Sequence, residues 1–291
     1  MSATEPVLAF EARMELGESP VWDERTGTLL FVDIVRGAIA RFDPTRGEAE
    51  TVAVLDDPVG SIALRREGGL VAATGTSIVL LDEQSSRTVV ARLPDAGGLR
   101  FNDGACDAQG RYWVGTMALD VAPGRGTLWR YDDRGLAPMV APVSISNGID
   151  WSADGTRMYY VDSPSRRIDV FAFDAQDGSL SDRRTLTKID DAGASVPDGL
   201  TVDAEDHVWV ALWDGSAVRR YRPDGVLDRV VELPVSRPTS CAFGGDDLGD
   251  LYVTSARVGL SPAELEPQPH AGGVLVLRPG VTGRAPNRFS G

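Results

Sequence analysis

Residues 195–212 read SVPDGLTVDAEDHVWVAL and contain a short pattern that recurs through the chain. Pro197-Asp198-Gly199 is typical of a tight turn, and Leu200 to Val202 of a short strand. A second polar turn follows, and then an apolar strand from Val208 to Leu212. A carboxylate at the mouth of a strand is a common way to hold a metal ion. The stretch therefore predicts a strand-turn-strand unit with Asp198 at its start.

The apolar strand of this unit recurs roughly every 40 to 50 residues, which is the repeat length of a four-stranded propeller blade. Each copy follows a polar turn, and the six copies are Leu29–Asp33, Leu70–Thr74, Tyr112–Thr116, Met158–Asp162, Val208–Leu212 and Leu251–Ser255. Most copies are followed by a third strand. Helical periodicity is absent apart from one turn at most over Ser261 to Leu265. The pattern predicts an all-β fold, a six-bladed β-propeller with a central metal-binding channel.

The chain has no Gly/Ser linker, charge block or low-complexity run that would divide it. We therefore expect residues 1–291 to form a single domain, at a length that all-β propellers commonly reach. The apolar run Val7–Phe10 is expected to pair with Val274–Leu277 in the last repeat. That pairing would join the first and last sheets and remove an exposed edge.

Charge and cysteine content narrow the class of partner. The chain has 29 Lys and Arg against 43 Asp and Glu, a net charge of −14, which disfavours nucleic acid or an anionic membrane as a partner. The acidity suits a protein that binds a cation, although solubility alone also explains it. The two cysteines, Cys106 and Cys241, form no Cys-x-x-Cys pair, so neither a disulfide framework nor a thiolate zinc site is indicated. With no run near the ~18 to 20 apolar residues of a spanning helix, a cytoplasmic protein is expected.

Three polar residues occupy one shared position in the repeat. In a propeller the turn before each innermost strand points at the axis, and Glu18, Asn147 and Asp198 lie in that turn in three repeats. Two carboxylates and an amide oxygen are hard ligands that suit Ca²⁺, Mg²⁺ or Mn²⁺, and Zn²⁺ also takes carboxylate oxygens. Taken singly, Asn147-Gly148 and Asp198-Gly199 are explained as tight turns. Their shared position favours a metal site.

Other polar residues near these turns are candidates for substrate contact. Arg100 lies two residues before Asn102, so both alternate to the same face of an extended segment, where Arg100 could bind an anionic or polyhydroxyl substrate. A surface ion pair explains Arg100 equally well on spacing alone. Asp120 lies where an outward loop could overhang the channel. The only histidines, His207 and His270, give poor support for a triad or a His-rich zinc site.

At these residues the sequence resembles the regucalcin/gluconolactonase family of sugar-lactone hydrolases. The matching segments span nearly the whole chain in the family's order: Leu16–Trp22, Arg100–Gly104, Gly110–Met117, Ile145–Gly148, Pro197–Gly199, Thr239–Gly245 and Ala271–Gly273. The resemblance implies one divalent cation held by Glu18, Asn147 and Asp198, with Ca²⁺ or Zn²⁺ foremost and Mn²⁺ or Mg²⁺ also open. It implies that Arg100 and Asn102 contact substrate. Asp120 matches a position where the family's mammalian members have a substrate-contacting Glu.

The predicted activity is metal-dependent hydrolysis of a sugar lactone, an aldonolactone resembling gluconolactone, to the aldonic acid. The cation would polarise the carbonyl, Asp198 would act as general base for the attacking water, and Asn102 could orient that water or the substrate. Two alternatives are a phosphotriesterase-like hydrolase on the same scaffold and a non-catalytic calcium-binding regulatory protein. The expected partner is a small-molecule lactone, and the expected state is a monomer or a weak homo-oligomer.

Overall fold

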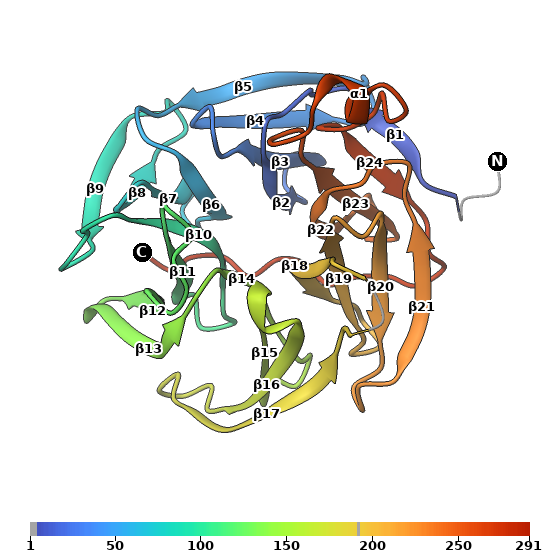
Figure 1. Ribbon diagram of the computed structural model, residues 1–291. Helices are drawn as coiled ribbons and strands as arrows, with labels where there is room; N and C mark the ends of the chain where they lie inside the picture. The colour runs from blue at the N-terminus through green and yellow to red at the C-terminus, as the bar shows by residue number, and fades with distance from the viewer. Residues whose placement is uncertain (1–4, 191–192) are drawn as a thin grey trace.

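Six antiparallel sheets of four strands each are arranged in a ring around a central axis (Figure 1). The computed structural model describes residues 5–190 and 193–291. The arrangement confirms the predicted all-β fold and the six-bladed propeller. We number the blades in chain order, and within each the strand nearest the axis comes first in blades 1 to 5.

Blades 1 to 3 occupy the first half of the chain. Blade 1 contains β2 (Gly17–Asp23), β3 (Thr28–Asp33), β4 (Ala38–Asp43) and β5 (Glu48–Val54). Blade 2 contains β6 (Val59–Leu64), β7 (Leu70–Thr74), β8 (Ser77–Leu81) and β9 (Arg87–Arg92). Blade 3 contains β10 (Leu99–Cys106), β11 (Tyr112–Ala118), β12 (Gly126–Asp132) and β13 (Gly135–Val143).

Blades 4 to 6 complete the ring. Blade 4 contains β14 (Ser146–Trp151), β15 (Arg157–Asp162), β16 (Arg167–Phe173) and β17 (Leu180–Lys188), with the 3₁₀ turn η1 (Ser163–Ser165) after β15. Blade 5 contains β18 (Val196–Val202), β19 (Val208–Trp213), β20 (Ala217–Tyr221) and β21 (Leu227–Glu232). Blade 6 contains β22 (Pro238–Gly244), β23 (Asp250–Ser255), β24 (Val274–Leu277) and β1 (Val7–Phe10).

The ring is closed by β1, which joins blade 6 although it begins the chain. It runs antiparallel to β24 and pairs Val7 with Val276 and Leu8 with Leu275, as predicted. Every blade therefore has four strands, and the last one combines segments from both ends of the chain (Figure 1).

The second strand of each blade is buried on both faces, because every blade packs against two neighbours. All the residues of β3, β7 and β11 are buried. This double burial explains why these strands read as continuous apolar runs instead of alternating ones. Between blades 3 and 4, the Trp113 ring lies 6.0 Å from that of Trp151 and 5.9 Å from that of Phe173, measured between centroids.

The innermost strands are interrupted near the channel mouth, and the interruptions position the candidate site. Strand pairing shifts between Glu18 and Val21 in β2, between Ser146 and Ile149 in β14, and between Pro197 and Leu200 in β18. A break in the ladder frees the backbone to redirect a side chain. The same kind of break lies between Phe101 and Gly104 in β10.

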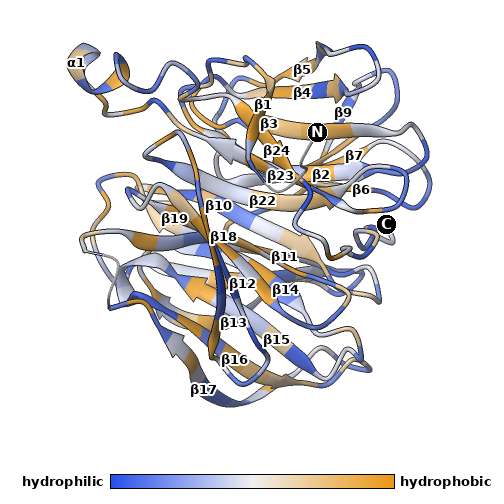
Figure 2. Cartoon of the chain, turned by 90° about the vertical axis from the view of Figure 1, so that its right-hand side faces the viewer, coloured by the Kyte–Doolittle hydropathy of each residue, from blue (hydrophilic) through white to orange (hydrophobic). Residues whose placement is uncertain are grey.

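The segment after β24, residues 281–291, crosses the opposite end of the channel, and we call it the strap. The strap contacts all six blades: its backbone bonds to Ala204, Leu248, Leu64 and Gly110, and its side chains reach Asp23 and Trp151. Figure 2 shows the C-terminus on one side of the ring and the one-turn helix α1 (Pro262–Leu265) on the other. No helix among the described residues is long and apolar enough to cross a membrane.

Candidate active site at the channel mouth

Five sequence-predicted residues line one cavity of about 280 Å³ at the channel mouth. They come from four blades: Glu18 from β2, Arg100 and Asn102 from β10, Asn147 from β14 and Asp198 from β18. Except for half-buried Arg100, each is at most 6% exposed. The structure thus brings together residues that lie as far apart in the chain as Glu18 and Asp198.

Close packing of the innermost strands explains the glycines that follow two of these residues. A Cβ atom on Gly148 would lie 2.7 Å from the carbonyl oxygen of Asp198 and 2.6 Å from the nitrogen of Leu200. Those contacts are with backbone, which cannot move aside as a flexible side chain can. Gly148 therefore lets blades 4 and 5 approach closely enough for Asn147 and Asp198 to share the cavity.

A chain of hydrogen bonds orients the two amide side chains. Arg100 Nη1 donates to Asn102 Oδ1 over 2.7 Å, and Asn102 Nδ2 donates to Asn147 Oδ1 over 2.9 Å. Asn147 Nδ2 in turn donates to Ser163 Oγ over 2.7 Å. These bonds fix the amide of Asn147 with its nitrogen toward η1. Its oxygen keeps a second lone pair, since a carbonyl oxygen has two.

The electrostatics of the cavity favour a bound cation. Burial raises the pKa of Glu18 well above its usual value, and the charges of Asp198 and Asp103 raise it further. Burial followed by the charge of Asp103 raises the pKa of Asp198 as well. Burial also lowers the pKa of Arg100 to about 10, against the opposing effect of the two carboxylates, so Arg100 still carries its charge at neutral pH. Buried like charges of this kind are stabilised by a divalent ion.

The donor set fits a hard divalent cation. Glu18 and Asp198 supply carboxylate oxygens, and the oriented amide of Asn147 supplies a neutral oxygen. Within residues 5–190 and 193–291, no group of three or more His, Cys, Asp or Glu side chains is arranged to hold a metal. The proposed set therefore depends on the amide of Asn147 as its third ligand.

Asp120 lies apart from the other candidates. It is exposed in the loop after β11 and does not line the cavity. Its Oδ1 accepts a hydrogen bond of 3.1 Å from the backbone nitrogen of Ala122. Between them Val121, with φ of 59°, lines the cavity. The carboxylate of Asp120 thus shapes the loop that places Val121 at the mouth.

Sequence reasoning did not identify the apolar residues that make up most of the remaining wall. We call them the apolar collar: Leu16, Ile34, Met117, Val121, Ile145, Val196 and Trp213. Three of them, Ile34, Val121 and Trp213, lie at or just after the end of a second strand, where a polar loop residue is usual. Apolar residues at these positions were a signal in the sequence that could have pointed to the collar.

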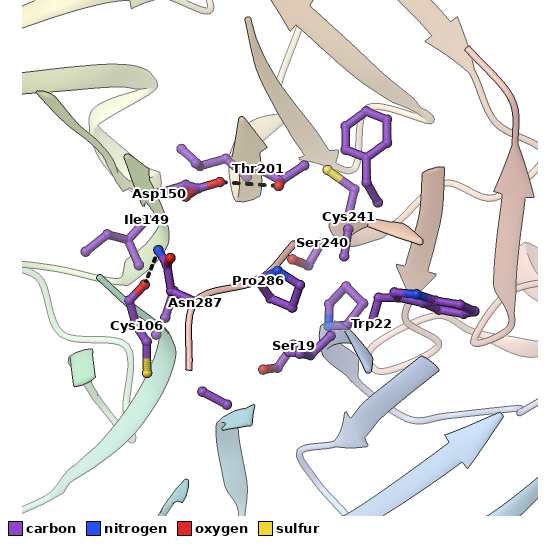
Figure 3. Close-up of a pocket in the computed structure, with 18 of the residues that line it drawn as sticks. Ser19, Trp22, Cys106, Ile149, Asp150, Thr201, Ser240, Cys241, Pro286 and Asn287 are labelled. Atoms are coloured by element: carbon purple, nitrogen blue, oxygen red, sulfur yellow. Dashed lines mark hydrogen bonds between the residues drawn. The ribbon is translucent and has the colours of Figure 1, made fainter. Parts of the chain in front are cut away.

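A second cavity, of about 130 Å³, lies toward the strap (Figure 3). Pro286 and Asn287 of the strap line it, and Asn287 Nδ2 donates to the carbonyl of Cys106 over 3.1 Å. Asp103 lines the same cavity, and burial raises its pKa to about 6. Asp103 therefore faces away from the mouth, although it follows Asn102 directly. Cys106 and Cys241, which also line this cavity, are free and buried.

Comparisons with known proteins agree with the fold and identify the family. A family model described as SMP-30/Gluconolactonase/LRE-like region matches residues 16–257. Regucalcin of Xenopus laevis is 42% identical over 288 residues, which are 95% of this chain and 95% of that protein. The solved structure of a calcium-binding protein, regucalcin, from Agrobacterium tumefaciens has a TM-score of 0.93 and 29% identity, and covers 98% of this chain and 97% of its own.

The solved structure of a gluconolactonase from Xanthomonas campestris has a TM-score of 0.76 and 20% identity, covering 94% of this chain and 89% of its own. At that identity the likeness shows the fold alone.

Proposed function

The chain belongs to the SMP-30/gluconolactonase/LRE-like family, and on this basis we propose that it is a metal-dependent lactonase, a carboxylic ester hydrolase that opens a sugar lactone of the aldonolactone type to its acid. One observation carries the proposal. Glu18, Asn147 and Asp198 line a single cavity together with the positively charged Arg100. The cavity is open at the mouth of the ring, and its size suits a small monocyclic substrate.

In this proposal Glu18, Asn147 and Asp198 hold the cation, for which Ca²⁺ and Zn²⁺ are the first choices to test. A bound divalent cation would polarise the lactone carbonyl and stabilise negative charge on its oxygen. Asp198 accepts a proton from the attacking water, since its carboxylate lies in the same cavity as the other proposed ligands and Arg100. Asn102, held between Arg100 and Asn147, orients the substrate or the water.

Arg100 supplies the positive charge on the substrate side of the cavity. Its Nη1 donates to Asn102 Oδ1 and to the carbonyl of Phe101, which fixes one edge of the guanidinium. The remaining donors are available to the ring oxygens of a lactone or to the carboxylate that forms when the ring opens.

A proton-release assay tests the proposal, because opening a lactone at neutral pH yields an acid. The protein is stripped with a chelator, reloaded with Ca²⁺, Zn²⁺, Mn²⁺ or Mg²⁺ in turn, and assayed with glucono-lactone and other aldonolactones. We expect turnover only after reloading and a loss of about 10²- to 10⁴-fold in kcat for Asp198→Asn. The exposed Asp133→Asn is the matched control and should keep full activity.

The same assay separates the two alternatives. A phosphotriesterase-like hydrolase would act on an organophosphate faster than on any lactone of the panel. A non-catalytic calcium-binding regulatory protein would bind the cation, as measured by calorimetry, and release no acid from either substrate. Either outcome would contradict the lactonase proposal.

A further inference from the structure

The polar groups of the cavity are largely occupied by one another. Asn102 Nδ2 donates to the carbonyl of Ser146 and to Asn147 Oδ1, both over 2.9 Å, so both of its hydrogens are in use. Its Oδ1 accepts from Arg100, and the hydroxyl of Ser163 accepts from Asn147. Apart from the proposed metal ligands, the groups that remain for a substrate are the free donors of Arg100, the hydroxyl hydrogen of Ser163 and the second lone pair of Asn102 Oδ1.

The wall above these groups is the apolar collar, and the fold holds it in place. The backbone nitrogen of Leu16 donates to Asp33 Oδ1 over 3.3 Å, and that of Ile145 donates to Asp162 Oδ1 over 3.0 Å. In two blades, therefore, the acid that ends the second strand fixes a collar residue just before the innermost strand. Because the same hydrogen bond occurs in both blades, the backbone holds these two apolar residues in fixed positions at the channel mouth.

Trp213 is held equally firmly at the rim. The guanidinium carbon of Arg237 lies 4.9 Å from the centroid of the Trp213 ring. Arg237 Nε also donates to Asp214 Oδ1 over 2.6 Å, which anchors the guanidinium in that position. The indole is thus a fixed apolar surface on the blade 5 side of the cavity.

Val121 is the clearest sign that an apolar side chain is needed at the mouth. Its φ of 59° lies in the left-handed region, which a β-branched residue rarely adopts and which costs about 1–2 kcal/mol. Asn or Gly would relieve that strain. The side chain is also 53% exposed, so core packing does not require Val there. Strain kept at an exposed position points to a role in binding.

The apolar surface continues outward onto the neighbouring loops. Val35 after β3 and Leu119 after β11 are 53% and 63% exposed. A substrate with a hydroxyl group on every carbon would lose water at this wall without gaining hydrogen-bond partners, which is unfavourable. An alkyl group would gain from burial at the same place.

We infer that the apolar collar selects lactones that carry an alkyl substituent on the ring carbon bonded to the ring oxygen, such as a deoxy sugar lactone, over their hydroxylated counterparts. The inference rests on the proposed lactonase function. With the carbonyl toward Glu18, Asn147 and Asp198, the far side of the ring and its substituent face the collar. Val121 is a specificity-determining residue in this arrangement, and Asp120 is a positioning residue that acts through the loop.

The test compares two aldono-lactones of the same ring and configuration, one ending in a methyl group and the other in a hydroxymethyl group. We expect kcat/KM of the cation-loaded protein to be about 10-fold or more higher for the methyl compound, within the range for one group in an apolar pocket. In a series of γ-alkyl butyrolactones, kcat/KM should rise with chain length until the cavity is filled. Equal values within twofold for the matched pair would overturn the inference and leave the lactonase proposal intact.

The variant Val121→Asn tests the residue assignment without risk to the fold, because Asn tolerates a positive φ. We expect it to bring the methyl preference close to unity, chiefly through KM, with thermal stability unchanged or increased. Val226→Asn is the control, since Val226 is also 53% exposed but lies in a loop away from the cavity. A preference that survives in Val121→Asn would remove Val121 from the proposal.

A binding measurement keeps the inference testable if no lactone is hydrolysed. The γ-lactams that carry a methyl or a hydroxymethyl group next to the ring nitrogen resist hydrolysis, and their affinities are measured by calorimetry with the cation-loaded protein. Tighter binding of the methyl lactam would support the proposed preference of the collar for an alkyl group, even if the lactonase proposal had failed. Equal or reversed affinities would overturn the inference independently.

Discussion

Asn102 of blade 3 and Asn147 of blade 4 are joined inside the channel by a hydrogen bond of 2.9 Å from Nδ2 to Oδ1. The bond connects the proposed substrate side of the cavity to the proposed cation side. Asn147 has its other partner in Ser163, so the position of its amide depends on both contacts. Asn102 therefore helps to orient Asn147, a proposed cation ligand, without being a ligand itself.

Removing this bond should weaken cation binding. We expect Asn102→Ala to lower cation affinity about 10- to 100-fold, the range for residues that orient metal ligands. The measurement is calorimetric titration of the chelator-treated protein with Ca²⁺. Asn287→Ala removes an amide from the strap end of the same channel and should leave that affinity unchanged. Equal losses in both variants would point to general damage to the fold.

Glu18→Gln should stabilise the cation-free protein while it weakens cation binding. Burial and the charge of Asp198 disfavour the ionised form of Glu18, so a neutral side chain of the same shape relieves that cost. We expect a gain of about 1 kcal/mol, or roughly 2 °C in Tm, without cation, and a cation affinity at least about 100-fold lower. Scanning calorimetry with and without Ca²⁺ measures both. Glu15→Gln, near the exposed Arg36, is the control that should change neither.

The pH dependence of stability should have an unusual sign in the cation-free protein. The pKa values of Glu18 and Asp198 are raised on folding, and that of Asp103 is raised to about 6. Such groups contribute stability that is complete below their unfolded values, near 4, and is lost as pH rises through the folded values. We therefore expect Tm to fall from about pH 4 to beyond pH 6, while cation affinity rises because the ligands lose protons.

Thermal melts in chelator and in excess Ca²⁺ across this range check the pH prediction. Asp103→Asn is the informative variant, because Asp103 is not a proposed ligand and its charge also raises the pKa of Glu18 and Asp198, so its removal should flatten the slope. A Tm that rises steadily from pH 4 to pH 7 in chelator would show that the three carboxyl groups do not control stability in this range.

The strap should contribute strongly to stability and little to activity. Phe289 is buried, and its ring lies 5.8 Å from that of Tyr131 in a stacked arrangement. We expect Phe289→Ala to cost about 3 kcal/mol, as for other buried aromatic side chains, with cation affinity and KM unchanged. Chemical denaturation measures the loss, and the exposed Val226→Ala should stay within about 0.5 kcal/mol of the parent protein. A change in KM would connect the strap to the distant mouth.

The sequence predicted the parts of the fold that are buried on both faces or repeat at a fixed interval. The second strands, such as β11, were found because double burial makes them apolar throughout. The outermost strands, such as β5 and β17, were not identified because they are largely exposed and mix polar and apolar residues. The pairing of β1 with β24 was predicted correctly from two short apolar runs.

The candidate site was predictable where a polar residue recurs at one place in the repeat. Glu18, Asn147 and Asp198 share such a place, and the structure puts them in one cavity. The collar could not be assembled from the sequence, since its members lie in loops whose conformation depends on packing between blades. The role of Asp120 also depends on a loop, because its bond to Ala122 follows from local backbone geometry that spacing does not reveal.

The closure of blade 6 by β1 has a consequence for synthesis on the ribosome. Val7–Phe10 leaves the ribosome well before its partner Val274–Leu277 is translated. At typical elongation rates the delay is roughly 15 to 50 s. For that time Val7–Phe10 is an apolar segment without its partner strand, so completion of this propeller is a late event that must compete with capture of that segment by other nascent chains.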